Sequence, residues 1–135
     1  MFGKNAKIEL LKGVPLFSDC SKRELTDIAQ VADEIDFPAG RTLIEEGKPG
    51  REFFVIADGT VEVRRGGRKL PPAGDSSSFG ETSLLTGKPR NATVTTTSPV
   101  RALVITDRAF KGLLKDIPSL APKLLANLAE RLDRG

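Results

Sequence analysis

The chain has 135 residues, 39% of them hydrophobic and 29% charged, and its 21 Lys and Arg against 18 Asp and Glu give a net charge of +3. The basic residues are scattered along the chain, so this small excess does not predict nucleic-acid binding. There is no His and a single Cys, which excludes Ser-His-Asp and Cys-His catalysis, the commonest zinc sites and an internal disulfide. We therefore expect no enzyme, no catalytic residues and no metal site.

The length suits one domain with a hydrophobic core, and no change in composition divides residues 1–135. No apolar run is long enough for a bilayer span, and residues 1–13 lack the apolar stretch of a signal peptide. A free thiol at Cys20 suits a reducing compartment. We expect a cytoplasmic protein with no membrane contact.

The first predicted element is an N-terminal helical segment over residues 5–33. Ser21 followed three residues later by Glu24 is a capping-box pattern. Apolar residues recur at helical spacing behind it. These are Leu25, Ile28, Ala29 and Ala32.

Residues 34–106 change to short β-type runs separated by turn residues, which predicts an antiparallel barrel or roll. The clearest hairpin is predicted where residues 52–56 and 60–65 flank Asp58-Gly59, because Asp-Gly favours tight turns between paired strands. Another strand is predicted at residues 100–106. Glu45 and Glu46 are adjacent, so on a strand they point to opposite faces, and we interpret them as solvated rather than as a catalytic pair.

Capping residues and apolar spacing predict two C-terminal helices within residues 107–133. Asp107 is the predicted cap of the first, and Ser119 opens the second with Pro122 tolerated in its first turn. The second helix carries an apolar stripe. Its members are Leu120, Leu124, Leu125, Leu128 and Leu132. The stripe is too short for sustained heptads, so core packing is the favoured interpretation, and a role in a dimer is compatible with it.

Residues 79–94, with the sequence FGETSLLTGKPRNATV, have the chemistry of a phosphate site. Gly80 allows close approach of the backbone, and residues 82–85 can form one helical turn whose free amides face an anion. The planar guanidinium of Arg90 can hold two phosphate oxygens. Glu81 suits hydrogen bonds from sugar hydroxyls. The alternative is an ordinary turn with solvated charges.

This segment resembles the signature of the cyclic nucleotide-binding domain family, and the resemblance extends over about residues 11–132. It implies an α+β fold that is mainly β with flanking helices: an antiparallel β-roll, or double-stranded jelly-roll barrel, between N-terminal and C-terminal helices. It also implies that Arg90 binds a cyclic phosphate and Glu81 a ribose 2′-hydroxyl. The full set of expected ligand-binding residues is Phe79, Gly80, Glu81, Thr82, Ser83, Leu84, Pro89, Arg90, Asn91, Ala92 and Thr93.

Two departures from the family pattern bear on the ligand. Ser76, Ser77 and Ser78 lengthen the approach to Phe79, and Asn91 stands where relatives that favour cyclic AMP often have Ala and those that favour cyclic GMP often have Thr or Ser. An amide can meet either purine, and cyclic AMP is weakly favoured. The chain has no Trp or Tyr to stack on the base from the last helix. The residues of the last helix that could cover the base instead are Leu128, Arg131, Leu132 and Arg134.

The resemblance implies a regulatory module that has no cofactor and binds cyclic AMP or cyclic GMP. It also implies that the C-terminal helices change position when the ligand is bound. The alternative is a non-binding domain of the same fold that serves dimerisation or protein interaction. Family members that regulate transcription carry a helix-turn-helix module after the last helix, and from the end at Gly135 we expect no DNA binding by this chain. A homodimer or an attached effector domain is the other expected partner.

A local basic cluster, Arg64, Arg65, Arg68 and Lys69, surrounds a Gly-Gly turn. It could contact a phosphate-rich partner. We favour a solvated hairpin tip, since exposed basic residues are the norm.

Overall fold

The computed structural model describes residues 3–71, 78–80 and 87–133, in the last helix without the side chains of residues 128 and 130–133. The helices are α1 (Lys4–Lys12), the 3-10 turn η1 (Pro15–Phe17), α2 (Lys22–Gln30), α4 (Asp107–Asp116) and α5 (Leu120–Asp133). The strands are β1 (Asp33–Phe37), β2 (Thr42–Ile44), β3 (Glu52–Asp58), β4 (Val61–Arg65), β5 (Arg68–Lys69), β6 (Ser78–Phe79), β7 (Thr93–Thr96) and β8 (Val100–Thr106).

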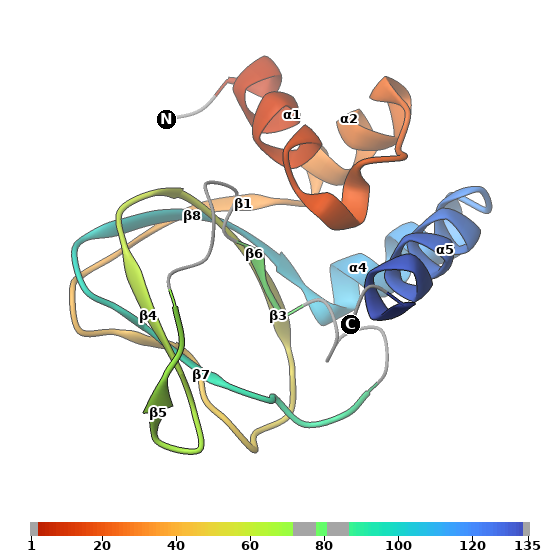
Figure 1. Cartoon of the computed structure of the whole chain (residues 1–135). Helices are drawn as coiled ribbons and strands as arrows, with labels where there is room; N and C mark the ends of the chain where they lie inside the picture. Colours follow the sequence, from red (N-terminus) through yellow and green to blue (C-terminus); the bar gives the residue numbers. More distant parts are fainter. Residues whose placement is uncertain (1–2, 72–77, 81–86, 134–135) are drawn as a thin grey trace.

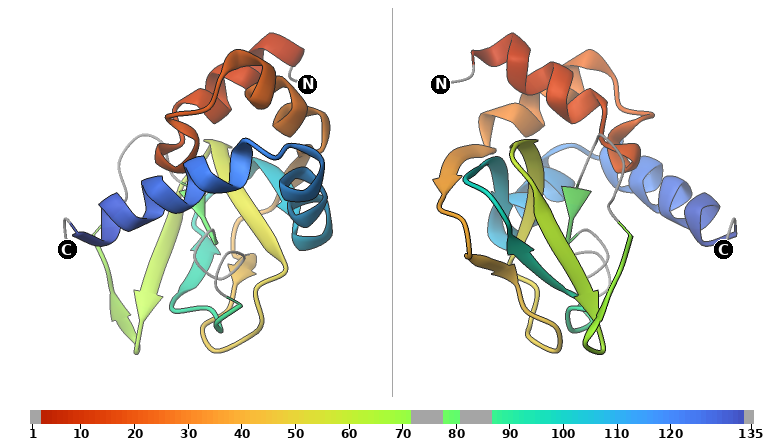
Figure 2. Two further views of the ribbon diagram at one scale, coloured as in Figure 1. Left: turned by 90° about the vertical axis from the view of Figure 1, so that its right-hand side faces the viewer. Right: turned by 60° about the vertical axis from the view of Figure 1, so that its left-hand side comes forward.

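The strands form two antiparallel sheets that face each other as a roll, with all the helices gathered on one side (Figures 1 and 2). One sheet has the order β1-β8-β3-β6 and the other β2-β7-β4-β5. Most strands pair with partners far from them in the chain, for example Phe54 of β3 opposite Val104 of β8. The antiparallel β-roll with flanking helices is therefore confirmed.

The central pair β3 and β8 is buried on both faces, and this divides the interior into two cores. Successive residues of a strand point to opposite faces, so Phe53 and Val55 pack among the helices while Phe54 and Ile56 face into the roll. In β8 the same alternation separates two sets. Leu103 and Ile105 join the helical core, and Ala102 and Val104 line the roll.

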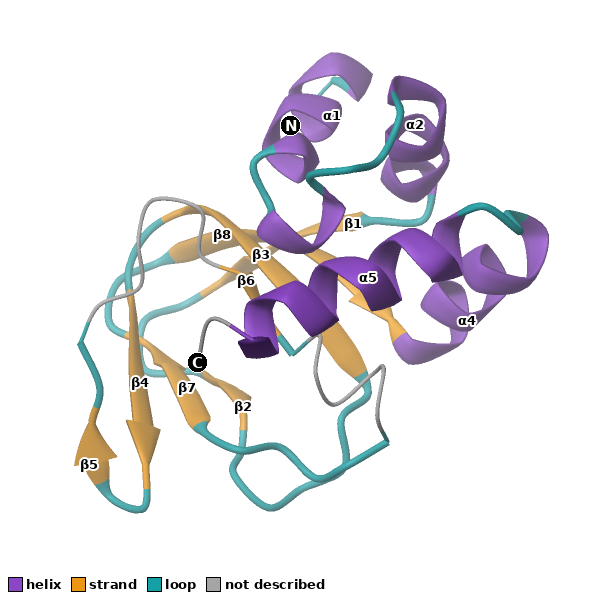
Figure 3. Cartoon of the chain, turned by 45° about the vertical axis from the view of Figure 1, so that its right-hand side comes forward, coloured by secondary structure: helices purple, strands orange, loops and turns teal. Residues whose placement is uncertain are grey.

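The helical core brings the two ends of the chain together over this sheet (Figure 3). Phe17 of η1 meets Phe53 edge to face, with ring centroids 5.7 Å apart. Phe110 of α4 and Leu120 and Leu124 of α5 are buried in the same cluster. Packing of the C-terminal apolar stripe into the core is thus observed for Leu120 and Leu124, whereas Leu125 is 59% exposed.

The predicted capping box of α2 is confirmed. The Glu24 amide donates to Ser21 Oγ at 3.1 Å, and the Ser21 amide donates to Glu24 Oε1 at 2.8 Å. The predicted cap of α4 is one residue off, because Thr106 Oγ1 accepts from the Ala109 amide and Asp107 is the first helical residue. Threonine is one of the residues preferred at a helix N-cap, because its hydroxyl oxygen can accept from a backbone amide of the first turn.

The predicted hairpin at Asp58-Gly59 is wrong, since β3 and β4 lie in different sheets. Gly59 has φ +100°, and a Cβ at this position would clash with the Pro99 carbonyl oxygen and lie 2.9 Å from the Cα of Val100, at the start of β8. The Thr60 amide donates to Ser98 Oγ and the Thr97 amide to the Thr60 carbonyl, so this turn is braced against another turn. The Asp-Gly signal correctly marks a reversal, but pairing is decided by partners distant in the chain.

A second departure concerns Glu45 and Glu46, which are exposed as expected but follow β2 in a turn rather than lying on a strand. The Glu46 carboxylate accepts from the Gly66 amide, and its own amide donates to Thr93 Oγ1. Glu46 therefore ties the β4–β5 hairpin to β7.

Glu24 joins the N-terminal helices to α5. Its side chain is buried and accepts hydrogen bonds from Ser119 Oγ at 2.6 Å and Lys123 Nζ at 2.7 Å, besides the Ser21 amide. The Lys123 hydrogen bond, with those of Ser119 and Ser21, lowers the pKa of Glu24 from 4.5 to about 2. Asn127 adds a hydrogen bond from its amide nitrogen to Ser18 Oγ. Burial raises the pKa of the nearby Cys20 thiol to about 11, so the half-buried Cys20 is a poor nucleophile.

Among the helices of the described residues, none has the length and apolar character of a membrane span.

Replacing Glu24 with Gln should lower the free energy of unfolding at pH 7 by about 2 kcal/mol, because charge-assisted hydrogen bonds to a buried carboxylate are lost. A carboxylate with a lowered folded-state pKa stabilises the fold above its unfolded pKa of 4.5, and this stabilisation disappears as the pH falls towards about 2. Urea unfolding at pH 7 and pH 3 measures both effects.

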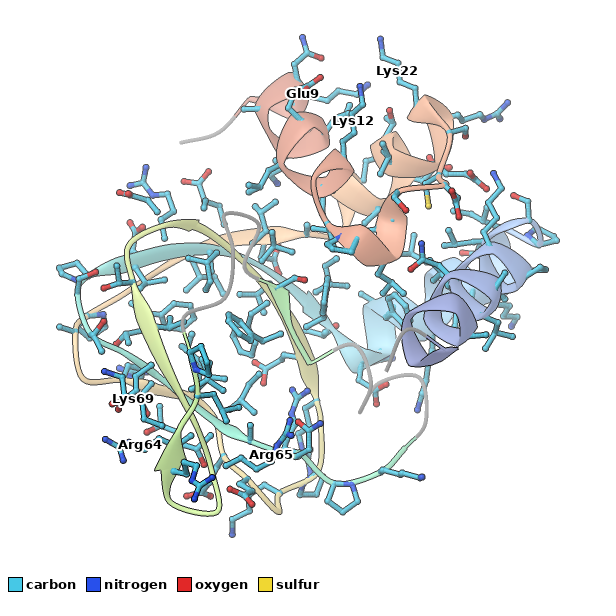
Figure 4. The ribbon with its side chains drawn as sticks, viewed as in Figure 1. Glu9, Lys12, Lys22, Arg64, Arg65 and Lys69 are labelled. Carbon is cyan, nitrogen blue, oxygen red and sulfur yellow. The ribbon has the colours of Figure 1, made fainter. Side chains whose placement is uncertain are left out.

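The exposed Glu9 on α1 provides the matched control (Figure 4). Glu9→Gln should leave stability unchanged at both values of pH. If Glu24→Gln costs the same at pH 3 as at pH 7, the carboxylate charge is not the source of the stabilisation.

Candidate functional site

The main chain of Arg90 is fixed by two hydrogen bonds to the turn after β2. Its amide donates to the Lys48 carbonyl at 2.8 Å, and its carbonyl accepts from the Gly47 amide at 2.9 Å. The turn after β2 and the segment before β7 are therefore joined at this residue. The side chain extends from this anchored backbone towards the start of β3.

The Arg90 guanidinium is buried, with only 6% of the residue exposed. Nη1 donates to the Gly80 carbonyl at 3.1 Å, and Nη2 donates to the Glu52 carbonyl at the first residue of β3. A buried arginine needs such partners, because an uncompensated charge inside a protein is costly. The guanidinium is thus fixed in one orientation between Gly80 and the start of β3.

Gly80 is the residue that makes room for this guanidinium. Its φ is +106°, in a region that favours glycine. A Cβ at this position would lie 2.5 Å from Arg90 Nη1 and 2.7 Å from the Glu52 carbonyl oxygen. Both the backbone conformation and the space exclude a side chain, so Gly80 and Arg90 form one structural unit.

A cavity of about 280 Å³ opens beside this unit, near the lower end of the size range of ligand pockets. Six of the expected ligand-binding residues line it. They are Phe79, Gly80, Pro89, Arg90, Asn91 and Ala92. Phe79 also packs against the core inside the roll, whereas the side chains of Pro89 and Asn91 are exposed at the mouth. The segments on either side of residues 81–86 therefore meet at one hollow.

Thr93 does not line the cavity. It begins β7, and its Oγ1 accepts from the Glu46 amide at 3.0 Å. Its hydroxyl is used to hold the turn after β2, which is a structural role.

Four expected site residues, Glu81, Thr82, Ser83 and Leu84, lie outside the described residues. The same holds for Ser76, Ser77 and Arg134, and for the side chains of Leu128, Arg131 and Leu132. Ser78, the last residue of the serine run, lies in β6 opposite Val55.

The apolar floor of the cavity was not predicted from the sequence. Ile44, Val63 and Val94 come from three neighbouring strands of one sheet, β2, β4 and β7. The alternation of apolar and polar residues along β4 could have placed Val63 on the inner face. No local pattern connects it with residues 79–94.

The cavity wall is strongly basic. Arg65, Lys88 and Arg90 line it, and the described lining includes no carboxylate. No group of three His, Cys, Asp or Glu suited to a metal occurs in residues 3–71, 78–80 and 87–133. An apolar floor with a cationic wall is complementary to an organic anion.

Comparison with known proteins gives relatives with two kinds of description. The chain is 32% identical over 134 residues to a "CRP-like cAMP-activated global transcriptional regulator" of Mycobacterium tuberculosis, covering 93% of this chain and 58% of that protein. It is 37% identical over 114 residues to a cAMP-dependent protein kinase regulatory subunit of Aspergillus fumigatus, covering 82% and 27% of the two chains. It thus spans little more than half of one relative and about a quarter of the other.

A solved structure, the N-terminal domain of a transcriptional regulator from Streptomyces coelicolor A3(2), matches with a TM-score of 0.80 and 31% identity over 93% of this chain and 90% of that one. Two of these three proteins are transcriptional regulators, which contradicts our expectation that DNA is excluded as a partner. That expectation used the charge and extent of this chain alone, which covers only 58% of the first of these regulators.

The sequence profile of the "Cyclic nucleotide-binding domain" matches residues 34–116, from β1 to the end of α4 and thus more than half of the chain. Except for Asp33, the first residue of β1, the matched stretch contains both sheets and every described residue of the cavity lining. On this match, and on relatives above 30% identity, the chain belongs to the cyclic nucleotide-binding domain family.

Proposed function

We propose that the chain is a regulatory sensor that binds a cyclic nucleotide in the cavity beside Arg90, with cyclic AMP preferred over cyclic GMP. The observation that carries the proposal is the buried Arg90 guanidinium, fixed between the Gly80 and Glu52 carbonyls at the wall of the cavity. A preorganised cation in a partly dehydrated site attracts a phosphate more strongly than a mobile surface charge does.

The remaining lining suits the rest of such a ligand. Ile44, Val63 and Val94 offer an apolar surface for a sugar and a base, and the exposed Asn91 amide at the mouth offers both a donor and an acceptor. The preference for cyclic AMP is supported by the two relatives whose descriptions name cAMP.

The ligand is released unchanged in this proposal. The chain has no His, and the described cavity lining contains no Cys or carboxylate to act as nucleophile or base. Binding energy is used only to shift a conformational equilibrium.

The C-terminal helices are the proposed moving part. α5 is attached by side-chain hydrogen bonds at Asn127, Lys123 and Ser119 and by burial of Leu120 and Leu124 in the helical core. None of these groups belongs to the core inside the roll. Ligand binding favours whichever arrangement of α4 and α5 has the higher affinity, by the ratio of the two affinities.

A non-binding domain of the same fold is the second candidate. It is favoured by the hydrogen bonds of Arg90 to main-chain carbonyls, because a guanidinium that donates to two of them already has a structural role. The two roles are compatible, since a guanidinium carries five N–H donors. Ligand titration decides between the candidates.

In isothermal titration calorimetry, the chain should bind one cyclic AMP, and Arg90→Ala should weaken binding by about a hundredfold, the equivalent of a lost charge-assisted hydrogen bond of about 2 to 3 kcal/mol. Arg90→Lys should retain part of the affinity because it keeps the charge. Cyclic GMP, titrated in parallel, should bind more weakly than cyclic AMP.

The control for this experiment is Arg101→Ala, an arginine of β8 that pairs with Asp36 away from the cavity. Its affinity for cyclic AMP should equal that of the unmodified chain. No heat from either nucleotide at millimolar concentration, with folded protein freed of bound nucleotide, would establish the non-binding domain instead.

Gly80→Ala should abolish measurable binding, because the new methyl group would displace the Arg90 guanidinium from the Glu52 carbonyl. Gly40→Ala is the matched control. Gly40 also has a positive φ, +83°, but no atom lies within 4 Å of the position that its methyl group would take, so only backbone strain is introduced. Calorimetry with thermal unfolding of both variants separates loss of the site from loss of stability, and equal affinities in the two variants would contradict the role assigned to Gly80.

Hydrogen exchange tests the movement of α5. Amide protection of residues 120–127 should change when cyclic AMP is added and should not change in Arg90→Ala. If cyclic AMP binds saturably and the protection of these amides does not change, α5 is not the element that responds to the ligand.

A further inference from the structure

Arg65 differs from the other basic residues of its hairpin. The β4–β5 hairpin carries Arg64, Arg65, Arg68 and Lys69 around Gly66-Gly67, and of these four only Arg65 is among the residues that line the described cavity. In Figure 4, Arg64 and Lys69 lie on the outer side of the hairpin and Arg65 on the side towards β7. The Arg65 side chain therefore lies at the cavity, whereas Arg64 and Lys69 lie on the outer side of the hairpin.

The Arg65 guanidinium is anchored despite its exposure. Nε donates to the carbonyl of Asn91 at 3.0 Å, and Asn91 directly follows Arg90. The hairpin is also tied down by the Gly66 amide, which donates to Glu46 Oε1 at 3.0 Å. These two bonds hold the cation beside the segment that carries Arg90, so part of the entropy cost of ordering this side chain is already met.

The terminal nitrogens of Arg65 have no protein acceptor in the part of the chain that the structure describes. There, Nε makes the one hydrogen bond of this side chain, and no carboxylate lies within ion-pair distance. The nearest acidic residue of β4, Glu62, is paired with Arg64 at 3.0 Å and Lys69 at 3.9 Å. Among the described residues, Arg64 and Lys69 thus have a carboxylate partner, whereas Arg65 has none.

We propose that Arg65 is a second arginine of the ligand site, whose terminal N–H groups donate to the anionic oxygens of the ligand's phosphate. The inference rests on the proposed function and extends it to a residue outside the 79–94 segment. Arg90 approaches from the wall formed by β3 and Gly80, and Arg65 approaches the same cavity from β4. Because a guanidinium anchored by Nε presents its two terminal nitrogens as a fork, it matches the two exocyclic oxygens of a cyclic phosphate.

Phosphate is favoured over a purine edge by charge and by position. Arg65 is fixed to the residue next to Arg90, and the described lining has three cationic side chains and no carboxylate. An anion is attracted by the guanidinium groups of Arg65 and Arg90, which line the same cavity, whereas a neutral base is not.

Calorimetric titration with cyclic AMP of the unmodified chain, Arg65→Gln, Arg65→Lys and Arg64→Gln tests the proposal. At about 50 mM KCl, Arg65→Gln should bind about tenfold more weakly, the size of a charge-assisted hydrogen bond at a partly exposed site. At about 500 mM KCl the difference should shrink to about threefold or less through screening. Arg65→Lys should lie between the two because it keeps the charge.

Arg64→Gln removes the same unit of charge from the adjacent residue. It therefore controls for long-range electrostatic attraction of the ligand and should change affinity by less than about twofold. Thermal unfolding should show that both Gln variants retain the fold, because both side chains are exposed.

Two results would overturn the proposal while leaving the sensor intact. If Arg65→Gln binds like the unmodified chain, Arg65 does not contact the ligand. If Arg65→Gln and Arg65→Lys lose the same affinity at both salt concentrations, Arg65 only braces the Asn91 carbonyl. Absence of binding by the unmodified chain is a different result, which removes the proposed function and this inference with it.

Discussion

The pairing of β3 with β8 is the constraint on which the rest of the structure depends. Both strands are largely apolar runs, and such runs are stable only when both faces of the sheet are covered. The helices cover one face and the second sheet covers the other, so the same two strands hold the helical core and the interior of the roll together. Full burial of a large apolar side chain contributes about 1.5–3 kcal/mol, and Phe53, Phe54, Leu103 and Ile105 are all buried there.

The site uses the end of this sheet as its support. The carbonyl of Glu52, the first residue of β3, accepts from Arg90, and the position of Glu52 is fixed by its pairing with Thr106 of β8. The Gly47-Lys48 turn fixes the Arg90 backbone from the other side. Arg90 is therefore held by main-chain groups of two different segments. Side chains on loops reach such precision only when a regular element supports them.

Local sequence patterns predicted the features that are decided locally. The capping box at Ser21 and Glu24, the strand at residues 100–106 and the helices at both ends follow from spacing of three or four residues or from alternation. The Asp58-Gly59 turn shows where this reasoning ends, because its residues specify a reversal and not the strand that will be paired. The strands on either side of this turn pair with distant segments, β3 with β8 and β4 with β7.

The same limit applies to the site. The 79–94 motif predicted that Gly80 lets the backbone approach a ligand, whereas the structure shows Gly80 making room for the Arg90 guanidinium, which donates to its carbonyl. It could not predict the contribution of β4, because Arg65 reaches Asn91 only after β4 pairs with β7. A run of basic residues near a turn is typical of a solvated tip. Arg65 is distinguished from Arg64 and Lys69 by its place in the cavity lining and by their pairing with Glu62.

Continuous contacts join the cavity to α5 through the same central strand. Glu52 accepts from Arg90, the next residue Phe53 packs on Phe17 of η1, and Ser18 at the end of η1 accepts from Asn127 of α5. In the proposed sensor, a ligand that binds the Arg90 guanidinium acts at the first link of this series. Contacts of this kind transmit a signal only if α5 has two arrangements with different ligand affinities. α5 is attached both by the buried side chains of Leu120 and Leu124 and by hydrogen bonds to Glu24 and Ser18, so a second arrangement must repack the two leucines as well as exchange these hydrogen bonds.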